Sequence, residues 1–149
     1  MTFGFIKFAH LLSVILAVGV FSVQYFIIQK NFRTEDTTIR RASESIALAI
    51  GKIIGQPMLL LAFITGILLL IYNPVLLKGG MALHIKILFV VFLLGLSHMS
   101  AKRLKTIAAA SAGMDEVSVN NNKKKLIALY RISGLFILII IFLIVLKPF

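Results

Sequence analysis

The sequence predicts an all-α integral membrane protein, an antiparallel four-helix transmembrane bundle with a cytoplasmic amphipathic helix, formed by residues 1–149 as a single domain. Composition is the first observation: the 149 residues are 60% hydrophobic and 14% charged, and their mean hydropathy is +1.03. Such values lie outside the range of soluble domains. The second observation is four apolar stretches, at about 5–29, 55–73, 81–100 and 126–146, each long enough to cross a hydrocarbon core of about 30 Å as a helix.

The first stretch follows Lys7, as the apolar part of a signal peptide would follow its basic residues. It has no small-residue cleavage site, however, and it continues through "SVQYFIIQK" at full spanning length. We therefore expect it to remain in the mature chain as the first span.

The first connection, about 30–55, has the periodicity of an amphipathic helix. Its apolar residues recur at helical spacing, opposite Arg40, Arg41, Ser43 and Glu44; they are Ile39, Ala42, Ile46, Ala49, Ile50 and Ile53. This pattern predicts a cytoplasmic helix that starts at a Thr37 or Thr38 cap and runs into the second span. Pro57 should bend this helix or mark its junction with the span.

The other two connections have the composition of loops. "YNPVLLKGG" predicts a short outer hairpin between spans two and three, because Asn-Pro and Gly-Gly are common turn pairs. "ASAGMDEVSVNNN" predicts a flexible inner loop before the fourth span. The "NNNKKK" run that ends it fits a solvated, lipid-facing loop better than a nucleic-acid site.

Charge predicts the orientation in the membrane. The net charge is +11, and most basic residues fall in the first and third connections: Lys30, Arg33, Arg40, Arg41, Lys52, Lys102, Arg103, Lys105, Lys123, Lys124 and Lys125. The positive-inside rule then places both connections in the cytoplasm and both termini outside it.

No acid is expected inside a span. All five acids lie in the same two connections: Glu35, Asp36, Glu44, Asp115 and Glu116. This excludes an intramembrane carboxylate relay, a paired-carboxylate hydrolase, a carboxylate-bridged diiron site and a Ser-His-Asp triad. The chain also has no cysteine, so a metal would have to be bound by His, Met or oxygen.

Two histidines form the candidate site. His10 lies about five residues into the first span and His84 about three into the third, so both are expected near the outer face. Two imidazoles at one depth are typical of the axial ligands of haem b; the alternative is that each simply hydrogen-bonds a neighbouring helix. One haem is expected, because Gln24 lies at the depth of His98 and is a poor haem ligand.

The remaining polar and sulfur-bearing residues have simpler interpretations. His98 is expected at the cytoplasmic edge of the membrane, and Met58, Met81 and Met99 are expected to pack. Lys86 has no acid at its depth. Its candidate partners are a ligand carboxylate such as a porphyrin propionate, backbone carbonyls and the headgroup region, and its long stem would also allow it to snorkel to the interface.

Several motifs occur together in a recognisable order. They are "FAHLLSVILAVGVF" with His10, "IIGQPMLLLAFITGILLL", "LHIKILFVVFLLGLSH" followed by "KRLK", and the terminal "LIVLKPF". In this combination the chain resembles the HemJ-type protoporphyrinogen IX oxidases, small four-span membrane proteins of bacterial haem synthesis. It departs from their pattern in lacking a first-span tryptophan and Pro-Arg pair, and in reading "YRIS" where the fourth span usually opens with Asn-Glu-x-Pro, so we expect a diverged member.

The resemblance implies a function. It implies haem b in the bacterial inner (plasma) membrane, with His10 and His84 as iron ligands and Lys86 as a propionate anchor or catalytic base. It also implies oxidation of a porphyrinogen substrate, protoporphyrinogen IX, to protoporphyrin IX, with electrons passing to quinone or the respiratory chain, by a protein alone or in a homo-oligomer.

Two alternatives remain open. One is a non-enzymatic membrane subunit, haem-carrying or structural, of a larger respiratory or photosynthetic complex, which would co-purify with stoichiometric partners. The other is a copper-handling protein using His10 and His84, which is less favoured because the methionines do not cluster at the depth of the histidines.

Overall fold

The computed structural model describes residues 2–74, 81–110 and 116–145, and these residues contain helices and no strand. The elements are α1 (Thr2–Asn31), α2 (Thr37–Ile50), a π-helical turn η1 (Gly51–Gly55), α3 (Gln56–Tyr72), α4 (Met81–Ala110) and α5 (Glu116–Val145). The all-α prediction is confirmed. Residues 75–80 of the expected hairpin, and the terminal Lys-Pro-Phe, lie outside the described residues.

Four helical segments in this part of the chain are long and apolar enough to cross a membrane: Thr2–Asn31, Thr37–Tyr72, Leu83–Ala110 and Val117–Leu143. Many of their large apolar side chains are exposed, including Phe5, Ile15, Leu60 and Leu138. Exposed apolar side chains on every long helix are what a lipid-facing surface requires. The structure therefore fits a multi-pass membrane protein.

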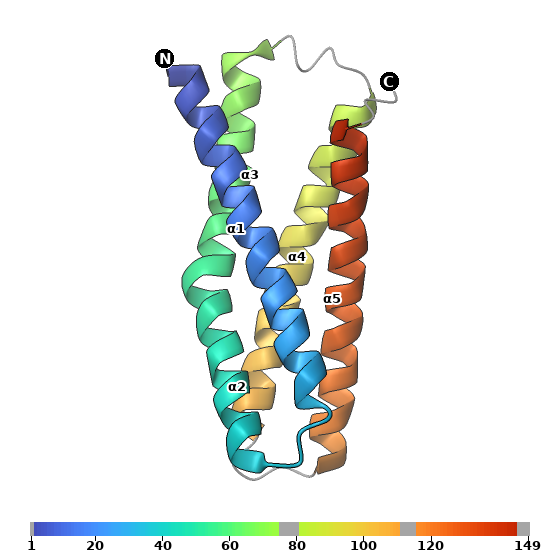
Figure 1. Ribbon diagram of the computed structural model, residues 1–149. Coiled ribbons are helices and arrows are strands. Elements are labelled where there is room, and N and C mark those ends of the chain that lie inside the picture. The colour runs from blue at the N-terminus through green and yellow to red at the C-terminus, as the bar shows by residue number, and fades with distance from the viewer. Residues whose placement is uncertain (1, 75–80, 111–115, 146–149) are drawn as a thin grey trace.

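The long helices lie side by side in two closely packed pairs (Figure 1). α1 packs against α3, and α4 packs against α5. The two pairs meet at the end of the molecule that holds α2, where α1 also contacts α5, and they diverge toward the first turn of α1. The buried core follows this pattern and includes Phe21, Ile28, Leu104, Leu126 and Tyr130.

The cap of α2 differs from the prediction. Asp36 is the N-cap, since its Oδ1 accepts hydrogen bonds from the backbone N–H groups of Thr38 at 2.8 Å and Ile39 at 3.3 Å. The prediction of a Thr37 or Thr38 cap was therefore wrong by one or two residues. Both threonines lie inside the first turn, where the carboxylate of Asp36 satisfies the free N–H groups.

The face of α2 that turns inward is not its apolar one. Ile39 and Ile46 are exposed, whereas Glu44 and Ala47 are buried. Apolar periodicity identified a face of α2 but not its partner, because a helix at a membrane can turn its apolar stripe outward to lipid. The inward face is then the one that carries the acid.

The helix from Thr37 to Tyr72 is continuous through η1. Within η1 the backbone hydrogen bonds join residues five apart instead of four, so that the N–H of Gln56 donates to the carbonyl of Gly51. Pro57, which has no N–H to donate, follows directly in the first turn of α3. Gly51 and Gly55 allow α1 to approach closely, since a Cβ on Gly55 would lie 2.8 Å from Val20 Cγ1.

The third connection is shorter than predicted. α4 continues to Ala110 and α5 begins at Glu116, so the "NNNKKK" run is helical rather than a loop. Lys123 is buried while Lys124 and Lys125 are exposed, and Lys123 Nζ lies 2.7 Å from Glu44 Oε1. The prediction of a solvated loop was wrong here, because a helix turns one of three consecutive residues toward its neighbours.

Candidate functional site

The imidazole of His10 is held by α3. Its Nδ1 lies 2.9 Å from the carbonyl oxygen of Ala62 and 3.1 Å from Oγ1 of Thr65. Because a carbonyl oxygen only accepts, Nδ1 must carry the proton and donate. The Thr65 hydroxyl gives its own proton to the Leu61 carbonyl at 2.7 Å and can accept from the ring. In the neutral ring, Nε2 then has a free lone pair.

Two neighbours of His10 were missed by sequence reasoning. Thr65 accepts from the ring, and Gly66 makes room for it, since a Cβ at that position would lie 3.3 Å from His10 Cε1. A carbonyl or hydroxyl that accepts from Nδ1 is the usual support of a histidine that binds metal through Nε2. A threonine and a glycine inside an apolar span are unusual enough to be noticed in the sequence, but only the packing of α1 on α3 shows that they are neighbours of His10.

His10 also borders an apolar cavity between the two helix pairs. The cavity has a volume of about 140 Å³. Every other residue that lines it is aliphatic or aromatic, and these are Val14, Ala17, Val18, Phe21, Leu59, Ala62, Val90, Leu93, Ile137, Ile140 and Ile141. His10 is therefore a polar residue at the edge of an otherwise apolar space.

The structure places Lys86, more clearly than His84, on the face of α4 that bears this cavity. Leu93 lines the cavity, and Lys86 precedes it by seven residues, which is about 20° from two full turns. His84 precedes Leu93 by nine residues and so lies about 180° away on the helix. In agreement, Lys86 is half-buried and His84 is exposed.

The donor set fits a haem on the His10 side. The supported imidazole and the apolar lining match an axial ligand and its surroundings. The cavity volume of about 140 Å³ is smaller than the roughly 300–1,000 Å³ of typical cofactor pockets. A macrocycle on His10 would therefore have to extend beyond this cavity, on the side where the helix pairs diverge (Figure 1).

The other sequence-selected residues lie elsewhere. Gln24 is buried and donates from Nε2 to the Ala47 carbonyl at 2.8 Å, which joins α1 to α2. His98 borders a different cavity at the α2 end. Met58 packs against the core and Met99 is exposed. Across the described ranges no three His, Asp or Glu side chains group as a metal site would need.

Comparison of the chain with protein-family models, curated proteins and solved structures gives no match. The resemblance to the protoporphyrinogen oxidases therefore rests on the quoted motifs.

Proposed function

We propose that the protein is a haem-b-binding membrane oxidoreductase that oxidises protoporphyrinogen IX to protoporphyrin IX or carries out a related redox reaction. The observation that carries the proposal is the state of His10. Its Nδ1 is committed to Ala62 and Thr65, which leaves the lone pair of Nε2 as the available ligand atom, and His10 lines an apolar cavity. A histidine kept only for helix packing would not need a cavity at its ring.

Each candidate residue has a distinct task. His10 would bind the iron through Nε2, and the hydrogen bond to Ala62 would fix the orientation of the ring and raise its basicity. Lys86, on the same face of α4 as Leu93, would offer a positive charge to a propionate or hold a proton at Nζ. His84 remains the candidate second ligand. The haem, when bound, supplies one-electron transfer.

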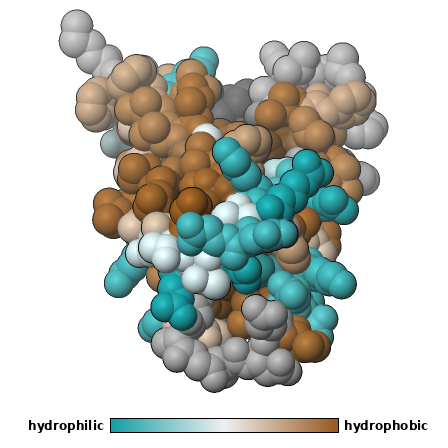
Figure 2. Space-filling view, turned by 60° about the horizontal axis from the view of Figure 1, so that its bottom comes forward, coloured by the Kyte–Doolittle hydropathy of each residue, from teal (hydrophilic) through white to brown (hydrophobic). Residues whose placement is uncertain are grey.

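The proposal includes an orientation. The chain would form an antiparallel bundle in a bacterial inner membrane, with α2 and both basic connections in the cytoplasm and both termini outside. The distribution of polar groups supports it. In the view of Figure 2 hydrophilic side chains gather at the end that holds α2, and apolar side chains predominate above them. Quinone or the respiratory chain would accept the electrons within the same bilayer.

The test is a reduced-minus-oxidised visible spectrum of detergent-purified protein expressed with ample haem. We expect a b-type α band, and we expect formation of fluorescent protoporphyrin from protoporphyrinogen IX above the rate of air oxidation. His84→Ala and Lys86→Gln separate the tasks on α4. Loss of the band in His84→Ala assigns the second ligand, whereas a kept band with lost activity in Lys86→Gln assigns the substrate or proton role.

Two results would decide against the oxidase. Absence of any haem band in the wild-type protein would reject haem binding altogether. A full haem band without activity, in protein that co-purifies with stoichiometric partners, would favour the non-enzymatic haem-carrying subunit. The large exposed apolar surface of all four long helices gives such partners room to bind.

A further inference from the structure

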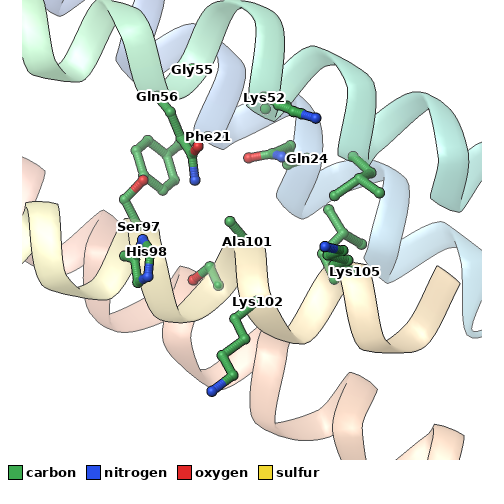
Figure 3. A pocket seen from close by; sticks show the side chains of 14 residues that line it. Phe21, Gln24, Lys52, Gly55, Gln56, Ser97, His98, Ala101, Lys102 and Lys105 are labelled. Carbon is green, nitrogen blue, oxygen red and sulfur yellow. The ribbon is translucent and has the colours of Figure 1, made fainter. Parts of the chain in front are cut away.

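A second cavity lies at the opposite end of the bundle from His10, where α1 and the α2–η1–α3 helix face α4 (Figure 3). Its volume is about 360 Å³, within the range of small-molecule sites. Residues of five elements, α1, α2, η1, α3 and α4, line it. They include Phe21, Gln24, Lys52, Gln56, Ser100 and Lys105.

The charge of this cavity has one sign. Lys52, Lys102 and Lys105 are among the lining residues, and none of those residues is an acid. The excess of positive charge favours an anionic ligand over a neutral one such as a quinone. Figure 3 shows Lys102 pointing away from the space, whereas Lys52 and Lys105 lie at its border on opposite walls. Both are exposed, so they are the two cations that a ligand entering the cavity would meet.

A buried hydroxyl in the cavity wall has no partner. Ser100 is 2% exposed, and its Oγ makes no hydrogen bond to any of the described residues. A buried hydroxyl without a partner is costly, so such groups normally have a ligand or an ordered water. The amide of Gln56 also points into the space (Figure 3), whereas the Nε2 of Gln24 is committed to the Ala47 carbonyl. The wall thus holds donors for oxygen atoms as well as positive charge.

The cavity is charged at one end and apolar at the other, as a bilayer leaflet is charged at its headgroups and apolar at its centre. Lys52 and Lys105 lie toward the α2 end, on opposite walls, while Phe21 and Gly55 lie toward the middle of the bundle (Figure 3). Exposed apolar residues on the same helices, such as Ile54 and Met99, continue to the membrane-facing surface. Basic pockets between spans on the cytoplasmic side commonly take lipid headgroups.

We propose that this cavity is a binding site for the phosphate headgroup of an anionic phospholipid. The phosphate oxygens would contact the ammonium groups of Lys52 and Lys105 and accept a hydrogen bond from Ser100. The acyl chains would leave along the apolar surface of α3 and α4. The site does not involve His10, so it stands or falls independently of the haem.

The test uses full-length, delipidated protein in neutral detergent and phosphate-free buffer. Its thermal unfolding is followed while dioctanoyl phosphatidylglycerol, dioctanoyl phosphatidylcholine or inorganic phosphate is added. We expect saturable stabilisation by phosphatidylglycerol alone. The double variant Lys52→Gln/Lys105→Gln should weaken its apparent affinity about tenfold or more. Ser100→Ala should weaken it severalfold.

The matched control is Lys124→Gln/Lys125→Gln, which removes two exposed lysines that do not line the cavity. It should keep the wild-type affinity. Equal stabilisation by phosphatidylcholine, or equal weakening by the two double variants, would overturn the proposal, because both results mean unspecific attraction. Stabilisation by inorganic phosphate without any by phosphatidylglycerol would also overturn it and would identify a soluble phosphate ligand.

Discussion

The Nζ of Lys123 lies 2.7 Å from Oε1 of Glu44, and each side chain is 1% exposed. The Nδ2 of Asn31 donates to the same carboxylate oxygen at 3.0 Å. One buried acid therefore joins α1, α2 and α5. Because both charges are removed from water, we expect the pair to fix which face of α2 turns inward more than to add net stability.

Removal of one partner of this pair should be strongly destabilising. Lys123→Met removes the ammonium group that lies 2.7 Å from the buried Glu44 carboxylate, and the loss of one partner of a buried ion pair should lower the free energy of unfolding by about 3–5 kcal/mol. The double variant Lys123→Met/Glu44→Leu should recover most of that loss. Denaturant unfolding in detergent measures both, and a double variant as unstable as the single one would contradict the assignment.

Asp36 should be the residue that caps α2. Asp36→Ala removes the acceptor of the Thr38 and Ile39 N–H groups and should destabilise the protein by about 1 kcal/mol. Thr37→Ala keeps that acceptor and serves as the control. Thermal unfolding that is more sensitive to Thr37→Ala than to Asp36→Ala would restore the cap that the sequence first suggested.

Gly55 should tolerate no side chain. The Cβ of Gly55→Ala would lie 2.8 Å from Val20 Cγ1, so α1 and η1 would have to separate, at about 1–3 kcal/mol. The control is Gly95→Ala, because nothing lies within 4 Å of a Cβ at that position. Comparable unfolding free energies for the two variants would show that α1 does not pack on η1 in this way.

Thr65 should support haem binding through His10. Thr65→Val keeps the shape of the side chain but removes one of the two acceptors of the ring N–H, the other being the Ala62 carbonyl, and the resulting loss of haem affinity should be about tenfold. Ser13→Ala is the matched control, since the buried Ser13 hydroxyl donates to the Ala9 carbonyl of its own helix. Haem content per protein, titrated on apoprotein, compares the two. Equal affinities would mean that Thr65 does not act on the ring.

The long helices were predictable because apolar length alone determines them. Each predicted span overlaps one of the four long apolar segments of the structure, and no predicted span extends beyond its segment by more than about three residues. The helical turns that lie outside the predicted spans, such as the start of α5, were not predictable from apolar length. The first turns of α5 bring Lys123 against Glu44, and that partner comes from a distant segment.

The candidate site was predictable only in part, for the same reason. His10 stood out because a polar ring inside an apolar span needs a partner. The identity of that partner, Thr65, follows from the packing of α1 on α3 and from no local pattern. Spacing within α4 puts Lys86, rather than His84, on the face of Leu93, but only the packing of α4 against the other helices turns that face toward the cavity.

Chemical rescue of His10→Gly is the most direct test of the central claim, that His10 Nε2 binds a haem iron. The variant, purified with haem present, is reduced and its visible spectrum recorded with and without added imidazole. The account predicts that the b-type α band is lost in His10→Gly and returns with imidazole, which can occupy the vacated space. A variant with an undiminished band in the absence of imidazole would contradict the claim.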